Sequence, residues 1–105
     1  MRPDPRQAPL RELVDLTTRQ LDAARRMDAA AMQSLNDARS DALFALQVAG
    51  GDAPSPSPDQ AAELVALARE LGRLELRLRT VVGTVLTALG GAPETTYRPT
   101  GQLVG

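Results

Sequence analysis

The chain has 105 residues, with twelve arginines, thirteen acidic side chains and a formal net charge of −1, and it contains no lysine, histidine, cysteine or tryptophan. This balance argues against a nucleic-acid or anionic-membrane surface, which needs basic residues gathered on one face, and the lack of cysteine excludes disulfides and thiolate metal sites. Only Phe44 and Tyr97 are aromatic, so the composition suits elongated helices packed along their lengths better than a compact globule.

The first eight residues carry two prolines and charges of both signs without an apolar run. This pattern predicts a disordered leader over residues 1–8 and no secretory signal peptide. Nowhere in the chain do about 18 apolar residues follow one another, so we expect no membrane span and a cytoplasmic protein.

A long amphipathic helix is predicted over residues 9–49. Pro9 suits the first position of a helix, where its missing N–H costs nothing, and Gly50 and Gly51 would end the helix, which would be about 60 Å long. The apolar positions that recur at helical spacing are Leu10, Leu13, Val14, Thr17, Leu21, Ala24, Ala31, Met32, Leu35, Ala38, Ala42, Leu46 and Ala49.

Two charged residues, Asp28 and Arg39, project onto the apolar side of this predicted helix. Either the helix twists slightly as it supercoils and carries both charges to the edge of the stripe, or it breaks, with Asp28 capping a second segment that begins at Ala29. Local propensity favours one continuous helix, because the residues from Ala29 to Met32 are strong helix formers.

Residues 50–58 form a linker that contains three prolines in alternation, which forbid helix. Ser57, Pro58, Asp59 and Gln60 then read as a capping box with proline at the first helical position. The second helix is predicted over residues 59–89, with Gly90 as its terminator. The fold class is therefore all-α, an antiparallel hairpin of two long helices (residues 9–89) that self-association or a client helix would complete to a bundle.

The second helix carries two apolar stripes. The main seam follows steps of three and four and consists of Leu64, Leu67, Leu71, Leu74, Leu78, Val81, Val85 and Ala88. A weaker stripe lies on the other side, where Leu76 projects roughly 160° away from Leu78; it consists of Val65, Ala68, Gly72, Leu76, Gly83 and Leu86. Its two glycines each cost about 1 kcal/mol inside a helix. Three explanations are open: close packing against a neighbouring helix or second subunit, a groove for a client helix, or a cost that the helix simply tolerates. On the first helix, the pair Phe44 and Val48 points away from the stripe and would extend a second contact surface.

The residues that carry most enzyme chemistry are missing. Without histidine or cysteine, catalysis would depend on two carboxylates held in one pocket. The acids are instead spread over helix surfaces beside arginines, as Glu75 is beside Arg79. We therefore predict a protein that is not an enzyme and that has no catalytic residues, no metal site, no cofactor and no small-molecule substrate.

The chain closes with a tail, residues 90–105, that contains its only tyrosine. Gly90, Gly91 and Pro93 stop the helix and leave a flexible joint, and Tyr97 and Leu103 supply an aromatic and an aliphatic anchor. We expect this flexible tail to bind a partner.

Three segments together resemble the FlgN family of flagellar export chaperones. They are the stretch from Met27 to Leu35, the leucine-rich helix from Leu64 to Leu89, and the closing segment from Thr96 to Leu103, which is similar to the family's Tyr-x-x-x-Gly-x-Leu tail. The chain departs from the family in having no asparagine near the middle of its second helix and in being shorter than typical members.

This resemblance implies a cytoplasmic chaperone for flagellar type III secretion. Such a protein binds hook-associated (hook–filament junction) proteins and prevents their premature assembly. Chaperones of the FliT type, which serve the filament cap, share the helical hairpin and are the nearest related interpretation. The candidate partner-binding residues are Val65, Gly72, Leu76, Arg79, Gly83, Leu86, Tyr97 and Leu103.

A different class of function explains the same leucines. In a homo-oligomeric coiled-coil scaffold or adaptor protein without a client, the leucine stripes would simply pair with one another. In either case we expect the free chain to be a homo-oligomer, because two helices with alanine-rich seams bury little apolar area by themselves.

Overall fold

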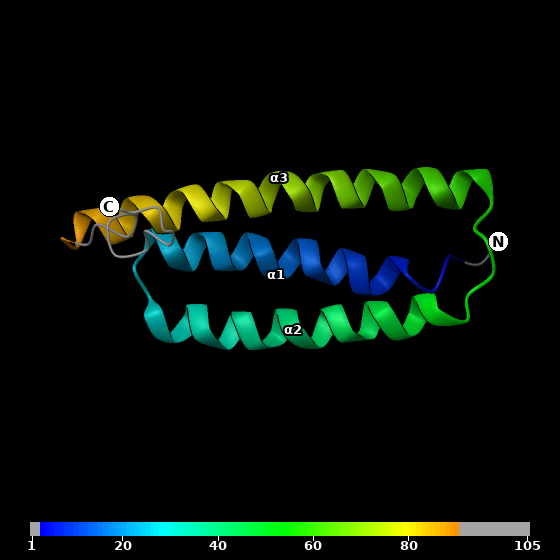
Figure 1. Ribbon diagram of the computed structural model, residues 1–105, viewed down its shortest axis with the longest axis horizontal. Coiled ribbons are helices and arrows are strands. Elements are labelled where there is room, and N and C mark those ends of the chain that lie inside the picture. The colour runs from blue at the N-terminus through cyan, green and yellow to red at the C-terminus, as the bar shows by residue number, and fades with distance from the viewer. Residues whose placement is uncertain (1–2, 91–105) are drawn as a thin grey trace, which may run out of the picture.

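The computed structural model describes residues 3–90, which form three helices and no strand: α1 (Gln7–Arg25), α2 (Ala29–Gly51) and α3 (Pro58–Ala88). Figure 1 shows α1 in the middle, with α2 running antiparallel to it on one side and α3 running parallel to it on the other. The all-α prediction is confirmed. The two-helix hairpin is wrong, because the first predicted helix is two helices and α3 packs against α1.

A tight turn divides the first predicted helix. The amide of Met27 donates to the carbonyl of Ala24 at 3.0 Å, and the amide of Asp28 donates to that of Ala23 at 2.9 Å. Met27 has a φ of 55°, so these bonds form the Schellman motif that closes α1. The Asp28 carboxylate then accepts from the amide of Ala31 at 3.0 Å and caps α2. The packing of α2 back onto α1 therefore overrides the local preference for one continuous helix.

The predicted leader is structured from residue 3 onward. The Arg6 guanidinium donates to both carboxylate oxygens of Asp4, at 2.7 and 2.6 Å, and Asp4 is only 4% exposed. These side-chain hydrogen bonds lower the pKa of Asp4 to about 2 and raise the pKa of Arg6. Arg6 also donates to the carbonyl of Pro54 at 3.1 Å, which ties the α2–α3 linker to the start of α1. The disordered leader is thus wrong for these residues, and α1 begins at Gln7, two residues earlier than predicted.

Both ends of α3 follow the sequence signals. The Ser57 hydroxyl accepts from the amide of Gln60 at 3.2 Å, and the Gln60 side-chain oxygen accepts from the amide of Ser57 at 2.8 Å, with Pro58 at the first helical position. This confirms the predicted capping box. After Ala88, Gly90 takes a φ of 91°, a conformation that costs glycine little and ends the helix.

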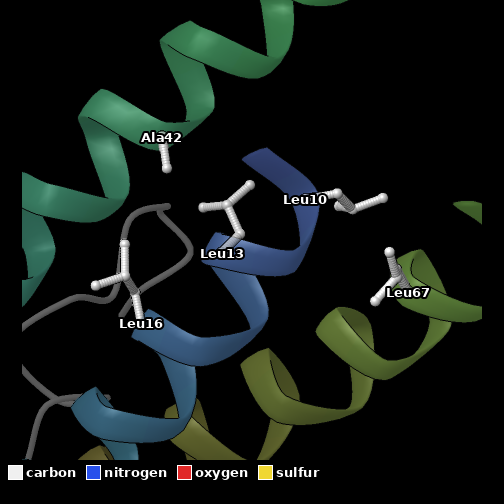
Figure 2. Close-up of a cluster of buried hydrophobic side chains, with 5 residues drawn as sticks. All are labelled: Leu10, Leu13, Leu16, Ala42 and Leu67. Carbon is white, nitrogen blue, oxygen red and sulfur yellow. The ribbon is translucent and has the colours of Figure 1, made fainter. Parts of the chain in front are cut away.

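The first part of the core surrounds the beginning of α1. In Figure 2 the Leu10 side chain lies beside Leu67 of α3, while Leu13 points toward Ala42 of α2. Leu13 has no exposed surface. The short side chain of Ala42 lets the α2 backbone come close to α1, and successive leucines of α1 thus pack against its two neighbours.

The second part of the core lies toward the other end of α1 and consists of Leu21, Ala24 and Leu78. It confirms the predicted seam of α3 as the face that packs on α1: Leu67 and Leu78 are buried, and five further seam residues are half-buried. Ala88 is the exception, because it is exposed at the end of the helix.

A polar bridge connects all three helices. Arg39 of α2 donates to the side-chain oxygen of Gln20 at 3.1 Å and to the Glu75 carboxylate at 2.7 Å. Gln20 in turn donates to the backbone carbonyl of Met32 at 3.3 Å and is 5% exposed. Within the described chain no Cα of α2 lies within 8 Å of a Cα of α3, so this ion pair joins two helices whose backbones do not meet. Arg39 therefore spans the bundle and does not lie at the edge of its stripe.

Candidate partner-binding surface

The outer face of α3, defined here as Val65, Gly72, Leu76, Arg79, Gly83 and Leu86, is the largest group of predicted partner-binding residues. The structure leaves five of them exposed and Gly83 half-buried, and Leu86 lies at the boundary with the inner side, about 80° from Leu78 around the axis. Leu76 is 60% exposed, Val65 47% and Leu86 44%. The separation from the main seam follows from helix geometry, because Leu76 and Leu78 are about 160° apart around the axis.

The two glycines of this face have no packing role within the described chain. A Cβ built on Gly72 or on Gly83 would meet no side chain, and no backbone beyond the helix itself, within 4 Å. Close packing against a neighbouring helix of the same protomer is therefore not the reason for either glycine. Two explanations remain, an approach by another molecule and a tolerated cost, since each glycine weakens an isolated helix by about 1 kcal/mol relative to alanine.

The charges around Leu76 differ from the expected pattern of neighbouring pairs. The Glu75 carboxylate was expected beside Arg79, but it turns toward α2 and pairs with Arg39. Within residues 3–90, no acidic side chain forms an ion pair with any of the four arginines of α3, which are Arg69, Arg73, Arg77 and Arg79. All four are exposed. The outer face is consequently an apolar strip bordered by unpaired positive charge.

An apolar pocket opens between the end of α3 and the α1–α2 turn. It has a volume of about 250 Å³, and its lining combines the end of α3 with the residues around the turn. Figure 1 shows that α3 extends past this turn. The residues of the lining are Ala24, Met27, Ala29, Met32, Val82, Val85, Leu86 and Leu89. Sequence reasoning missed this pocket because it depends on the break at Asp28; the Asp28 interruption was the one signal that pointed to it.

The pocket presents large exposed side chains. Leu89 is 69% exposed and Met27 is 56% exposed, although leucine and methionine are ordinarily buried. Leu86 belongs to both the pocket and the outer face of α3. Val85, in contrast, belongs to the main seam, so the pocket opens on the inner side of α3 and meets the outer face only at Leu86.

A separate apolar pair lies on α2. Phe44 is 68% exposed and Val48 is 61% exposed, which agrees with the prediction that they point away from the packed stripe. They lie one helical turn apart on α2, so they are separate from the outer face of α3.

The remaining predicted partner-binding residues, Tyr97 and Leu103, lie outside the described residues, as does the rest of the tail beyond Gly90. Within the described residues, no three acidic side chains gather into a group that could hold a metal ion. None of the described helices is both long enough and apolar enough to cross a bilayer.

Comparisons with protein-family models, with curated proteins and with solved structures gave no match to this chain. The resemblance to the FlgN family therefore stays a prediction. Any functional assignment has to be argued from the residues and the geometry given above.

Proposed function

We propose that this protein is an export chaperone of the FlgN type, which holds hook-associated proteins in the cytoplasm before flagellar type III secretion. The proposal joins the sequence resemblance to one structural observation, the exposed apolar strip on the outer face of α3. Val65, Leu76 and Leu86 are each more than two-fifths exposed, and exposed apolar strips at helical spacing are typical of surfaces that bind an amphipathic helix of a partner.

The arrangement suits a holding role because binding and folding use different sides of the same helix. α3 is anchored through Leu67 and Leu78, so the outer face is available without unfolding the bundle. A preformed, rigid helix face also keeps the entropy cost of binding low. The tail, with Tyr97 and Leu103, would add a second contact to the client.

The direct test uses the full chain and helical terminal fragments of the hook-associated proteins encoded in the same genome. We expect a mixed complex in analytical ultracentrifugation. A fragment of the filament-cap protein serves as the matched comparison, and preference for it would favour a FliT-type chaperone instead. Self-association with no mixed complex would favour the homo-oligomeric scaffold and contradict the proposal.

The tail can be tested in the same assay. Deletion of residues 92–105 should leave helicity and melting temperature nearly unchanged, since α1, α2 and α3 supply the two core clusters of the described residues. It should weaken client binding at least tenfold, or about 1.4 kcal/mol. A truncated protein that binds as tightly as the full chain would show that the tail is not a binding element.

A further inference from the structure

We infer that the outer face of α3 selects an acidic amphipathic helix, that is, a partner helix whose apolar stripe is flanked by glutamate or aspartate. The inference rests on the proposed function and names the chemistry of the partner. It starts from the surroundings of Leu76. At about 100° per residue, Arg69 lies within about 20° of Leu76 around the axis, and Arg73 and Arg79 lie about 60° to either side.

These arginines are available for a partner because the acids of α3 are either engaged elsewhere or displaced from them. Glu75 pairs with Arg39 at 2.7 Å, and Glu63 pairs with Arg11 at 3.1 Å. Glu70, the remaining acid in this stretch, projects about 120° away from Leu76. The described structure thus leaves an apolar centre with three cationic neighbours and no anionic neighbour on the same face.

Arginine favours carboxylate partners, because its planar guanidinium can donate two parallel hydrogen bonds to one carboxylate. A helix laid along α3 with leucines over Leu76 and acids beside them would bury the apolar strip and neutralise the arginines together. Gly72 lies next to this centre, and a Cβ built on it would meet nothing within 4 Å outside its own stretch of helix. The partner backbone can therefore approach closely at that position.

The same charges argue against a second copy of this chain as the occupant. Pairing α3 with another α3 through this face would bring Arg69, Arg73 and Arg79 of one protomer against the arginines of the other, and like charges at an interface are destabilising. If the free chain self-associates, the exposed Phe44 and Val48 on α2 offer a second apolar surface. For an acidic partner, in contrast, each of these arginines makes binding more favourable.

The test uses the full chain and two designed helical peptides with the same leucine stripe, about three heptads long, one flanked by glutamate and the other by lysine. In fluorescence anisotropy titrations the glutamate peptide should bind at least tenfold more tightly, about 1.4 kcal/mol. Its affinity should fall as salt is raised, because the contacts are charged and near the surface. Leu76→Glu should abolish binding while circular dichroism shows unchanged helicity.

A pair of charge reversals makes the test specific. Arg73→Glu should reduce binding of the glutamate peptide and improve binding of the lysine peptide. Arg25→Glu is the matched control, because Arg25 is also exposed on a helix, forms no ion pair in the described chain and produces the same change in net charge. It should leave both affinities unchanged. If the two reversals act equally, the selectivity comes from net charge and the inference is wrong.

Other outcomes separate this inference from the proposed function. Equal binding of both peptides, or binding of phosphatidylcholine vesicles that contain phosphatidylserine without binding of the glutamate peptide, would overturn it. So would self-association that Leu76→Glu abolishes, because that result makes a second copy the occupant. If a hook-associated fragment binds Arg73→Glu and Leu76→Glu as well as the wild type, the chaperone function stands and this surface is not its site. If the glutamate peptide binds and no hook-associated fragment does, the surface stands and the proposed function falls.

Discussion

On its inner face α3 presses Leu67 and Leu78 against α1, and both side chains are less than one-tenth exposed. On its outer face Leu76 is 60% exposed, although it is the same residue type and only two positions from Leu78. The inner leucines take part in the two core clusters. The outer leucine has glycine and arginine for neighbours. One helix thus carries a core surface and a candidate interface, and residue type alone does not tell them apart.

The charges make the difference between these faces clearer. Glu75 lies between the two faces of α3, and its carboxylate turns toward Arg39 of α2. Its ion pair therefore belongs to the inner side of α3. Arg79, one turn along the helix, is left without an acidic partner in the described chain. Unpaired charge costs little in water, so an exposed arginine is no defect. It becomes useful only if a partner brings the missing carboxylate.

The strongest test of the two faces compares two leucine truncations. Leu78→Ala should destabilise the protein by about 2–5 kcal/mol, because it removes a buried side chain and leaves a cavity. Leu76→Ala should cost less than about 1 kcal/mol, since an exposed leucine contributes little to folding. Urea denaturation followed by circular dichroism measures both. Equal losses would mean that Leu76 belongs to the core and that the separation into two faces is wrong.

The second test removes the polar bridge that Arg39 forms with Gln20 and Glu75. Arg39→Ala should destabilise the protein by about 1–2 kcal/mol, because it leaves Gln20 in the core without its donor. Glu75→Gln should cost less, since the Glu75 side chain is 43% exposed and water can replace the arginine. Chemical denaturation of both variants shows which of them loses more free energy of unfolding. If Glu75→Gln proves the more costly of the two, the bridge depends on charge pairing and not on the satisfaction of Gln20.

The third test adds a methyl group to the outer face. Gly72→Ala should stabilise the free protein by up to about 1 kcal/mol, because alanine is the better helix former and the new Cβ meets no atom within 4 Å. Gly83→Ala should act in the same direction for the same reason. Thermal denaturation measures the gain. If a partner helix approaches closely at Gly72, the more stable variant should bind it less tightly; destabilisation by the methyl group would instead reveal packing at this position.

The sequence predicts the elements whose signals are local. The capping box at Ser57 and Gln60 and the terminator at Gly90 depend on a few neighbouring residues, and the structure confirms both. The two faces of α3 follow from helical spacing alone. Those features carried the prediction of an all-α fold and of an exposed second stripe.

The features that the sequence did not predict depend on tertiary contacts. Met27 adopts a left-handed conformation, which is unusual for methionine, and the alanines after Asp28 favour helix. The local sequence preferences therefore favour one continuous helix through this turn. The break becomes favourable only when α2 folds back and buries Ala42 against α1. The two charges that interrupted the apolar stripe, Asp28 and Arg39, were the available signals: one is a cap and the other a bridge.

The last and smallest effect compares the unpaired arginines of the outer face with a paired one. Arg6 is held by both carboxylate oxygens of Asp4, and these hydrogen bonds lower the pKa of Asp4 from 3.8 to about 2. A pKa that is lower in the folded state means that the carboxylate stabilises the fold fully above about pH 4 and that this contribution is lost as the pH falls toward 2. Loss of stability between these values should therefore be smaller in Asp4→Asn than in the wild type. An NMR titration of the Asp4 carboxyl group reports the pKa directly, and Arg6→Gln should raise it toward its usual value, whereas Arg73→Gln on the outer face should leave it unchanged. If Asp4 titrates near pH 3.8 in the wild type, the pair does not hold in solution, and Arg6 would then resemble the arginines around Leu76.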